Sequence, residues 1–82
     1  MDNETPYTPV SCTTHSEYEL YIMHRKRLAM TWSDEQGNQH SAIVLPRDLV
    51  TRNNQEFLIV EDQQRRQHCI RLDRIQNYRP ET

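Results

Sequence analysis

The segment that decides the fold class is QEFLIVED, residues 55–62. Its four apolar residues, 57–60, form an uninterrupted run between two acidic residues. A short apolar run bounded by turn signals is typical of a strand that is buried on both faces. Asn53 and Asn54 precede the run and the polar residues 62–66 follow it, and both segments favour turns. The run therefore predicts a central strand with a turn on each side.

A hairpin is expected before this strand. Residues 28–33 alternate between large apolar and small or polar side chains, the period-two pattern of a half-buried strand. Residues 34–38 then form a polar turn around Gly37, the only glycine of the chain. Residues 42–45 read as the returning strand. Pro46 is expected to end that strand and to begin a turn, because proline donates no backbone hydrogen bond.

The C-terminal quarter predicts the remaining strands. Ile70 and Leu72 alternate with charged residues, which indicates a half-exposed strand, and Ile75 with Tyr78 would form the edge of the sheet. Four or five short strands after one helix fit a strongly bent sheet better than a flat one. The predicted fold is therefore mainly β, a small Sm-like β-barrel of about five strands with one short N-terminal helix.

The helix is expected to begin near Ser16. Glu19 follows Ser16 by three residues, and this spacing fits a capping box. Tyr18, Tyr21 and Ile22 recur at helical spacing and form one apolar stripe, while Glu17 and Glu19 are expected to face solvent. The helix should end at residues 24–26.

The chain of 82 residues has room for one domain. Hydrophobic residues make up 34% of it and charged residues 27%, which is lean but typical of a folded protein. Pro6 and Pro9 favour an irregular start. We expect a flexible N-terminal arm over residues 1–10, a single domain over residues 11–79 and a frayed tail over residues 80–82. No internal repeat is apparent.

The sequence indicates a cytoplasmic protein with no membrane segment. No apolar run approaches the roughly 20 residues of a membrane-spanning helix. The first residues, MDNE, lack the basic and apolar regions of a secretory signal. In a reducing compartment Cys12 and Cys69 are expected to remain thiols.

Charge is unevenly distributed along the chain. Residues 1–24 contain acidic residues and no lysine or arginine, and Arg25, Lys26 and Arg27 follow at once. An acidic segment with interleaved tyrosines can compete for a basic surface that accepts aromatic side chains. A solvated helix face explains the same pattern equally well.

Three motifs, in order along nearly the whole chain, resemble the Rho-binding antiterminator (Rof) family. The first resembles that family's Y-x-P-I-x-C segment, ahead of Glu19 and Leu20, and consists of Tyr7, Pro9, Val10 and Cys12. The second resembles D-L-V-x-R-x-N-x-E-[YF]-L-x-V-E and consists of Asp48, Leu49, Val50, Arg52, Asn54, Glu56, Phe57, Leu58, Val60 and Glu61. The third resembles R-L-D-K-I and consists of Arg71, Leu72, Asp73, Arg74 and Ile75.

The resemblance implies a protein that binds the transcription termination factor Rho, a hexamer, on its primary RNA-binding surface and so prevents RNA loading and termination. It implies no catalysis and no cofactor, and we expect a monomer when free. The expected contacts are Glu17 and Glu19 as phosphate mimics, with His15 and Ser16 beside them, and additional contacts from Arg47, Asp48, Arg52 and Asn54. Asp48 is equally suited to capping a turn.

One departure from the family pattern affects the expected site. The family is more acidic just after the cysteine, in a C-D-x-Y-D-like segment, whereas this chain has TTHS at residues 13–16. Two or three expected charges are therefore missing. The change implies weaker binding, a contact set that uses hydroxyl groups, or loss of the interaction with Rho.

Catalysis and metal binding are weaker interpretations. No nucleophile motif or phosphate-binding loop occurs, so we expect no enzyme activity. Cys12 and His15 have a spacing seen in zinc sites, but the adjacent His68 and Cys69 would point to opposite faces of a strand. We expect no metal site, with Cys69 buried and His68 exposed.

Direct RNA binding by an Sm-like barrel is the main alternative function. The C-terminal half contains Arg65, Arg66, Arg71, Arg74 and Arg79. The formal net charge of −2 and the scarcity of exposed aromatic residues in that half make direct binding unlikely. Trp32 and Phe57 occupy inward positions of predicted strands, so they are assigned to the core and not to a stacking surface. His24 and His40 are assigned no role.

Overall fold

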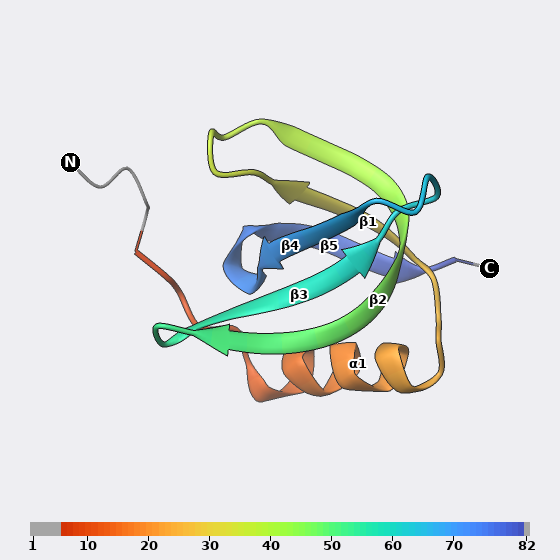
Figure 1. The fold of residues 1–82 in the computed structure, drawn as a ribbon. Coiled ribbons are helices and arrows are strands. Elements are labelled where there is room, and N and C mark those ends of the chain that lie inside the picture. Colours follow the sequence, from red (N-terminus) through yellow and green to blue (C-terminus); the bar gives the residue numbers. More distant parts are fainter. Residues whose placement is uncertain (1–5, 82) are drawn as a thin grey trace.

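The structure is a computed structural model that describes residues 6–81, so residues 1–5 of the predicted arm and the last residue of the predicted tail lie outside it. Within this range the chain forms one helix and five strands (Figure 1). In chain order the elements are α1 (Cys12–Met23), β1 (Leu28–Ser33), β2 (Gln39–Arg52), β3 (Gln55–Glu61), β4 (Gln67–Arg71), a 3₁₀ turn (Leu72–Arg74) and β5 (Ile75–Pro80).

The five strands form one antiparallel sheet in the order β4-β3-β2-β1-β5. The prediction of a mainly β fold with one N-terminal helix is confirmed. The sheet bends strongly along β2, as Figure 1 shows. In the described residues β4 and β5 are the two edge strands, so the sheet is not closed into a barrel.

The predicted turn at Pro46 is wrong, because β2 continues through this residue for 14 residues in all. Val44 is the last residue that pairs with β1, and Leu45 is the first that pairs with β3. The pairing with β3 then shifts register between Pro46 and Asp48, which is a bulge. Proline is tolerated at such a position because the ladder is interrupted there. The bulge also explains where the long strand bends.

The helix begins one turn earlier than predicted. Ser11 is its N-cap residue, and its Oγ accepts a hydrogen bond from the backbone N–H of Thr14 at 3.1 Å. This hydroxyl caps the helix at Cys12, so Ser16 lies inside the helix and forms no capping box. The predicted end is confirmed, since His24 is the C-cap residue. The apolar stripe is also confirmed, with Tyr18 buried and Tyr21 and Ile22 packed against the core.

The core lies on the concave side of the sheet. Its buried hydrophobic residues in the described chain are Tyr18, Leu28, Met30, Trp32, Val44, Leu58, Val60, Ile70 and Leu72. Burial alternates along β3, with Leu58 and Val60 buried and Phe57 and Ile59 half-buried. The expectation that β3 is buried on both faces is therefore wrong, because only one face of this strand points into the core. Of the two aromatic residues assigned to the core, Trp32 is buried there as predicted, whereas the prediction for Phe57 is wrong because it lies on the other face of β3.

Two of the hairpin turns share the pattern Asp-x-Gln-x-x-Gln-His, at residues 34–40 and 62–68. In the first, Asp34 Oδ1 accepts backbone hydrogen bonds from Gln36 and Asn38, each at 2.9 Å, and Oδ2 lies 2.9 Å from His40 Nε2. Asp62 makes the same contacts with Gln64, Arg66 and His68, at 2.9, 2.9 and 2.8 Å. The expectation of no internal repeat missed this duplicated turn. The predicted turns are otherwise confirmed, including the one at Asn53 and Asn54, which both have positive φ as a tight hairpin requires.

Candidate functional site

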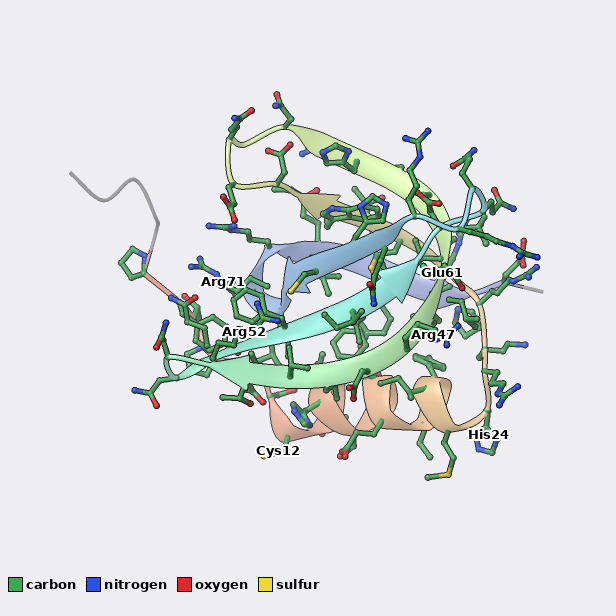
Figure 2. All side chains as sticks on the ribbon, in the orientation of Figure 1. Cys12, His24, Arg47, Arg52, Glu61 and Arg71 are labelled. Carbon is green, nitrogen blue, oxygen red and sulfur yellow. The ribbon has the colours of Figure 1, made fainter. Side chains whose placement is uncertain are left out.

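The structure divides the predicted contact residues between two ends of the molecule. Helix α1 runs antiparallel to the second half of β2, so the start of the helix lies near the β2–β3 turn (Figure 1). Figure 2 shows Arg52 and Cys12 toward this end. It shows Arg47 and Glu61 toward the other end, where the helix finishes at His24. The predicted residues therefore do not form one compact site.

A network of polar side chains connects the start of the helix to the sheet. His15 Nε2 lies 2.8 Å from Glu56 Oε2 on β3, and His15 Nδ1 lies 3.5 Å from Glu19 Oε1. The hydroxyl of Tyr7 donates a hydrogen bond to the other oxygen of Glu56 at 3.2 Å. Partial burial, followed by the charge of Glu56, raises the pKa of the Tyr7 phenol. Glu56 therefore connects the N-terminal segment, the helix and the sheet.

These residues present a surface with several acceptor groups. A hollow of about 380 Å³ is lined by Val10, Cys12, His15, Ser16 and Glu56. We define Cys12, His15, Ser16, Glu19 and Glu56 as the helix-start surface. The side chain of Glu19 is 60% exposed, and those of His15 and Glu56 are about one-third exposed, at 32% and 31%. The surface therefore presents two carboxylates to a partner that carries arginine or lysine.

Glu17 does not belong to this surface. Its carboxylate accepts a short hydrogen bond from the hydroxyl of Tyr78 on β5, and its side chain is half-buried. Residues two apart on a helix do not face each other, so Glu17 and Glu19 point to different sides. The prediction that both face solvent is wrong for Glu17. Burial, followed by the hydrogen bond to Glu17, raises the pKa of Tyr78 to about 12.

The four predicted contact residues on and after β2 have separate environments. Arg47 Nη1 lies 3.3 Å from Glu61 Oε1. Asp48 Oδ1 accepts a hydrogen bond from the backbone N–H of Leu49 at 2.9 Å, next to the bulge. Arg52 and Asn54 are exposed at the β2–β3 turn. Arg52 and Asn54 thus lie at the same end of the molecule as the helix-start surface, whereas Arg47 does not (Figure 2).

Arg71 has a structural position that the alternating pattern did not predict. It is 3% exposed, and its Nε and Nη2 donate to the two carboxylate oxygens of Asp73 at 2.6 and 3.1 Å. Asp73 Oδ2 also accepts a hydrogen bond from the backbone N–H of Thr8 at 2.8 Å, and the guanidinium lies 5.7 Å from the ring centroid of Tyr7. The expectation of a half-exposed strand in which Arg71 and Asp73 alternate with Ile70 and Leu72 is therefore wrong, because Arg71 is buried and Leu72–Arg74 form a 3₁₀ turn. The pair of Arg71 and Asp73 positions Tyr7 next to Glu56.

The arginines of the RNA-binding alternative do not form one surface. Arg71 is buried, Arg65 and Arg66 lie in the β3–β4 turn, Arg74 lies in the 3₁₀ turn and Arg79 lies on β5. The sequence-based set is therefore distributed over several elements.

The two cysteines are exposed thiols on different elements, Cys12 on α1 and Cys69 on β4. The expectation that Cys69 is buried and His68 exposed is wrong, because Ile70 faces the core and His68 packs against Trp32. Residues 6–81 contain no group of three or more histidine, cysteine or acidic side chains that could hold a metal ion. In the same range no helix is long and apolar enough to span a membrane.

Comparison with known proteins identifies the fold alone. No protein-family model matches the chain, and no curated protein sequence matches it. Among solved structures, proteasome accessory factor B/C (PafBC) of Arthrobacter aurescens is similar, with a TM-score of 0.74 over 94% of this chain. The sequence identity is 14%, and the matching region is 13% of the PafBC chain. The arrangement of one helix and five strands therefore also occurs as a small part of a much larger protein.

Proposed function

We propose that this chain is a non-enzymatic Rho-binding antiterminator. In this proposal it is a cytoplasmic bacterial monomer that binds the Rho hexamer at its primary RNA-binding surface and blocks RNA loading. The order of three motifs in the sequence supports the family assignment. The strand order, with the long bent β2 shared between two hairpins, supports an Sm-like arrangement of the sheet, although the sheet is open.

The observation that carries the proposal is the fixed pair of carboxylates at the helix-start surface. Glu19 and Glu56 come from different elements, and His15 lies between them at 3.5 and 2.8 Å. Sites that bind single-stranded nucleic acid attract phosphates with basic side chains and stack the bases on aromatic ones. Two preorganised carboxylates can take the place of phosphates there, at a lower entropic cost than two mobile side chains.

The surroundings of the pair suit a protein partner. Ser16 supplies a hydroxyl group beside the carboxylates, and Leu20 is a large hydrophobic side chain that is 51% exposed on the same helix. Arg52 and Asn54 extend the surface at the neighbouring turn. The hydroxyl and amide groups offer hydrogen bonds in place of the charges that this chain lacks after Cys12. We therefore propose Glu19, Glu56, His15 and Ser16 as the central contacts, with Arg52 and Asn54 at the rim.

The test compares two charge-neutralising variants for binding to immobilised Rho. Glu19→Gln combined with Glu56→Gln is expected to weaken binding at least tenfold, about 1.4 kcal/mol, because two charge-assisted contacts are lost. Glu35→Gln combined with Glu81→Gln has the same change in net charge at exposed positions elsewhere and should bind as the wild type does. Thermal unfolding of both variants checks that the fold is intact. Equal affinity of the two folded double variants would contradict the assignment of the site.

A further inference from the structure

The end of the molecule opposite the helix-start surface contains a basic hollow. The hollow has a volume of about 600 Å³ and is lined by Arg27 before β1, Arg47 on β2 and Arg65 in the β3–β4 turn. An adjoining hollow of about 350 Å³ shares Arg47 and adds Arg25. We call these four arginines the basic end. All four are exposed, and Figure 2 shows Arg47 at the end of the molecule that lies away from Arg52.

The nearby acidic groups offset only part of this charge. Glu61 and Asp62 are the two acidic residues that line the larger hollow. Asp62 is already engaged by two backbone N–H groups of its turn and by His68 at 2.8 Å. Glu61 pairs with Arg47 at 3.3 Å, and such an exposed pair is weak. Four arginines thus stand against two acidic residues here, although the chain as a whole has twelve acidic residues against ten lysine and arginine residues.

Arg65 occupies a backbone position that usually belongs to glycine. Its φ is 63°, and the equivalent residue of the duplicated turn is Gly37, with φ of 86°. A side chain other than glycine or asparagine is strained in this conformation. The two turns are otherwise matched in their hydrogen bonds, so they form an internal comparison. The strained arginine stands at the turn that borders the basic hollow and glycine stands at the turn that does not.

The chemistry of the hollow favours a phosphate backbone over an acidic protein. Protein interfaces depend on aromatic or large apolar anchors in pockets. The apolar lining here is limited to Ile43 and Leu45, which are half-buried. Arginine guanidinium groups bind phosphates through bidentate hydrogen bonds, and such binding requires no contact with the bases.

We propose that the basic end binds the phosphate backbone of single-stranded RNA without sequence preference. This inference is independent of the proposed function, because the helix-start surface lies at the other end of the molecule. It also revises the expectation from net charge that direct nucleic-acid binding is unlikely.

The experiment measures anisotropy of a labelled oligo(U) across a salt series. Four phosphate contacts predict a slope of about −3 in log affinity against log salt, or roughly 50-fold weaker binding at 200 mM than at 50 mM salt. Arg27→Gln combined with Arg65→Gln should halve the slope, leaving roughly sevenfold. Arg74→Gln removes an arginine outside the basic end, in the 3₁₀ turn, and is the control. It should leave the slope unchanged.

Arg65→Gly separates binding from folding. It should raise the melting temperature, because glycine relieves the positive φ, and should lower RNA affinity at the same time. A flat salt dependence, or wild-type binding by the double variant, would overturn the proposal. Tighter binding of a polyglutamate peptide than of oligo(U) would also overturn it and would assign the basic end to an acidic protein. If the protein does not bind Rho, the expected RNA affinities of these variants stay the same, so the two proposals can fail separately.

Discussion

The indole of Trp32 on β1 and the imidazole of His68 on β4 are in contact, with ring centroids 5.6 Å apart. These two strands are not neighbours in the sheet, since β3 and β2 lie between them. His40 stacks on the same indole at 5.5 Å, with an interplanar angle of 19°. Side chains thus join the two hairpins across the concave side, where no backbone ladder closes the sheet.

The first prediction concerns Trp32. Trp32→Ala removes the ring that both hairpins share and is expected to destabilise the fold by about 3–5 kcal/mol, the range for large aromatic truncations in a core. The change in the free energy of unfolding is measured by urea denaturation monitored by circular dichroism. His24→Ala, at an exposed residue after the helix, is the control and should have little effect. A loss below about 1 kcal/mol for Trp32→Ala would contradict the role given to this contact.

The second prediction concerns the duplicated turns in acid. The hydrogen bond from His40, with help from two backbone N–H groups, lowers the pKa of Asp34 to about 2. The hydrogen bond from His68 lowers the pKa of Asp62 in the same way. A carboxyl group with a lowered pKa stabilises the fold above its unfolded value of 3.8 and loses that contribution as the pH falls toward 2. Melting temperature should therefore drop between pH 4 and pH 2.

Asp34→Asn tests this assignment. The variant should be less stable than the wild type at pH 6, and the difference between the two should shrink below pH 4. Glu35→Gln, the adjacent exposed acid, should follow the wild-type curve. A constant difference between Asp34→Asn and the wild type at every pH would show that the ionised carboxylate is not the stabilising group.

The third prediction concerns the contact between Tyr78 and Glu17. The raised pKa of Tyr78, about 12, means that the fold favours the neutral phenol. Its contribution to stability is complete below pH 10 and is lost as the pH rises toward 12. Tyr78→Phe should lose less stability than the wild type between pH 10 and pH 12. Ultraviolet titration of the variant should show one fewer tyrosine that ionises above pH 10. An unchanged late phase would contradict the assignment to Tyr78.

The fourth prediction concerns the buried pair of Arg71 and Asp73. Asp73→Asn removes the carboxylate that accepts two hydrogen bonds from a guanidinium that is 3% exposed, which is expected to cost roughly 3 kcal/mol. Because Asp73 also accepts the hydrogen bond from Thr8, cleavage of the chain at residues 6–10 should become faster in limited proteolysis. Arg71→Met combined with Asp73→Leu should destabilise less than Asp73→Asn, since both charges of the pair are removed together. The reverse order of stabilities would contradict the pairing.

The strands could be predicted where the local side-chain pattern alone indicated a strand. Residues 28–33 and 57–60 alternate or run apolar, and the turns between strands contain asparagine, aspartate or glycine, so element type followed from local chemistry. The prediction at Pro46 was wrong because the effect of a proline depends on the strand that pairs with it. β2 changes its partner from β1 to β3 between Val44 and Leu45, and this change depends on the tertiary structure. The prediction of a capping box at Ser16 was also wrong, because Ser11, which was not considered as a cap, is the N-cap residue.

The candidate site was predictable only in part. His15, Ser16 and Glu19 lie together because they share one helix, whereas the partner Glu56 comes from a strand about forty residues later and served in the sequence only as the boundary of an apolar run. The repeated Asp-x-Gln-x-x-Gln-His pattern was visible in the sequence and would have indicated the two matched turns. The basic end brings together two connections and strand β2, which no linear pattern reveals.

The proposed function is tested most directly by competition on Rho. Rho is loaded with a fluorescent oligo-dC, and the protein is titrated in while anisotropy is measured, with the Arg27→Gln and Arg65→Gln variant run in parallel to weaken direct binding of the oligonucleotide. The proposal predicts saturable release of the oligonucleotide by both proteins and at least tenfold weaker release by the Glu19→Gln and Glu56→Gln variant. Anisotropy that stays constant at protein concentrations far above that of Rho would contradict the proposal that this chain is a Rho-binding antiterminator.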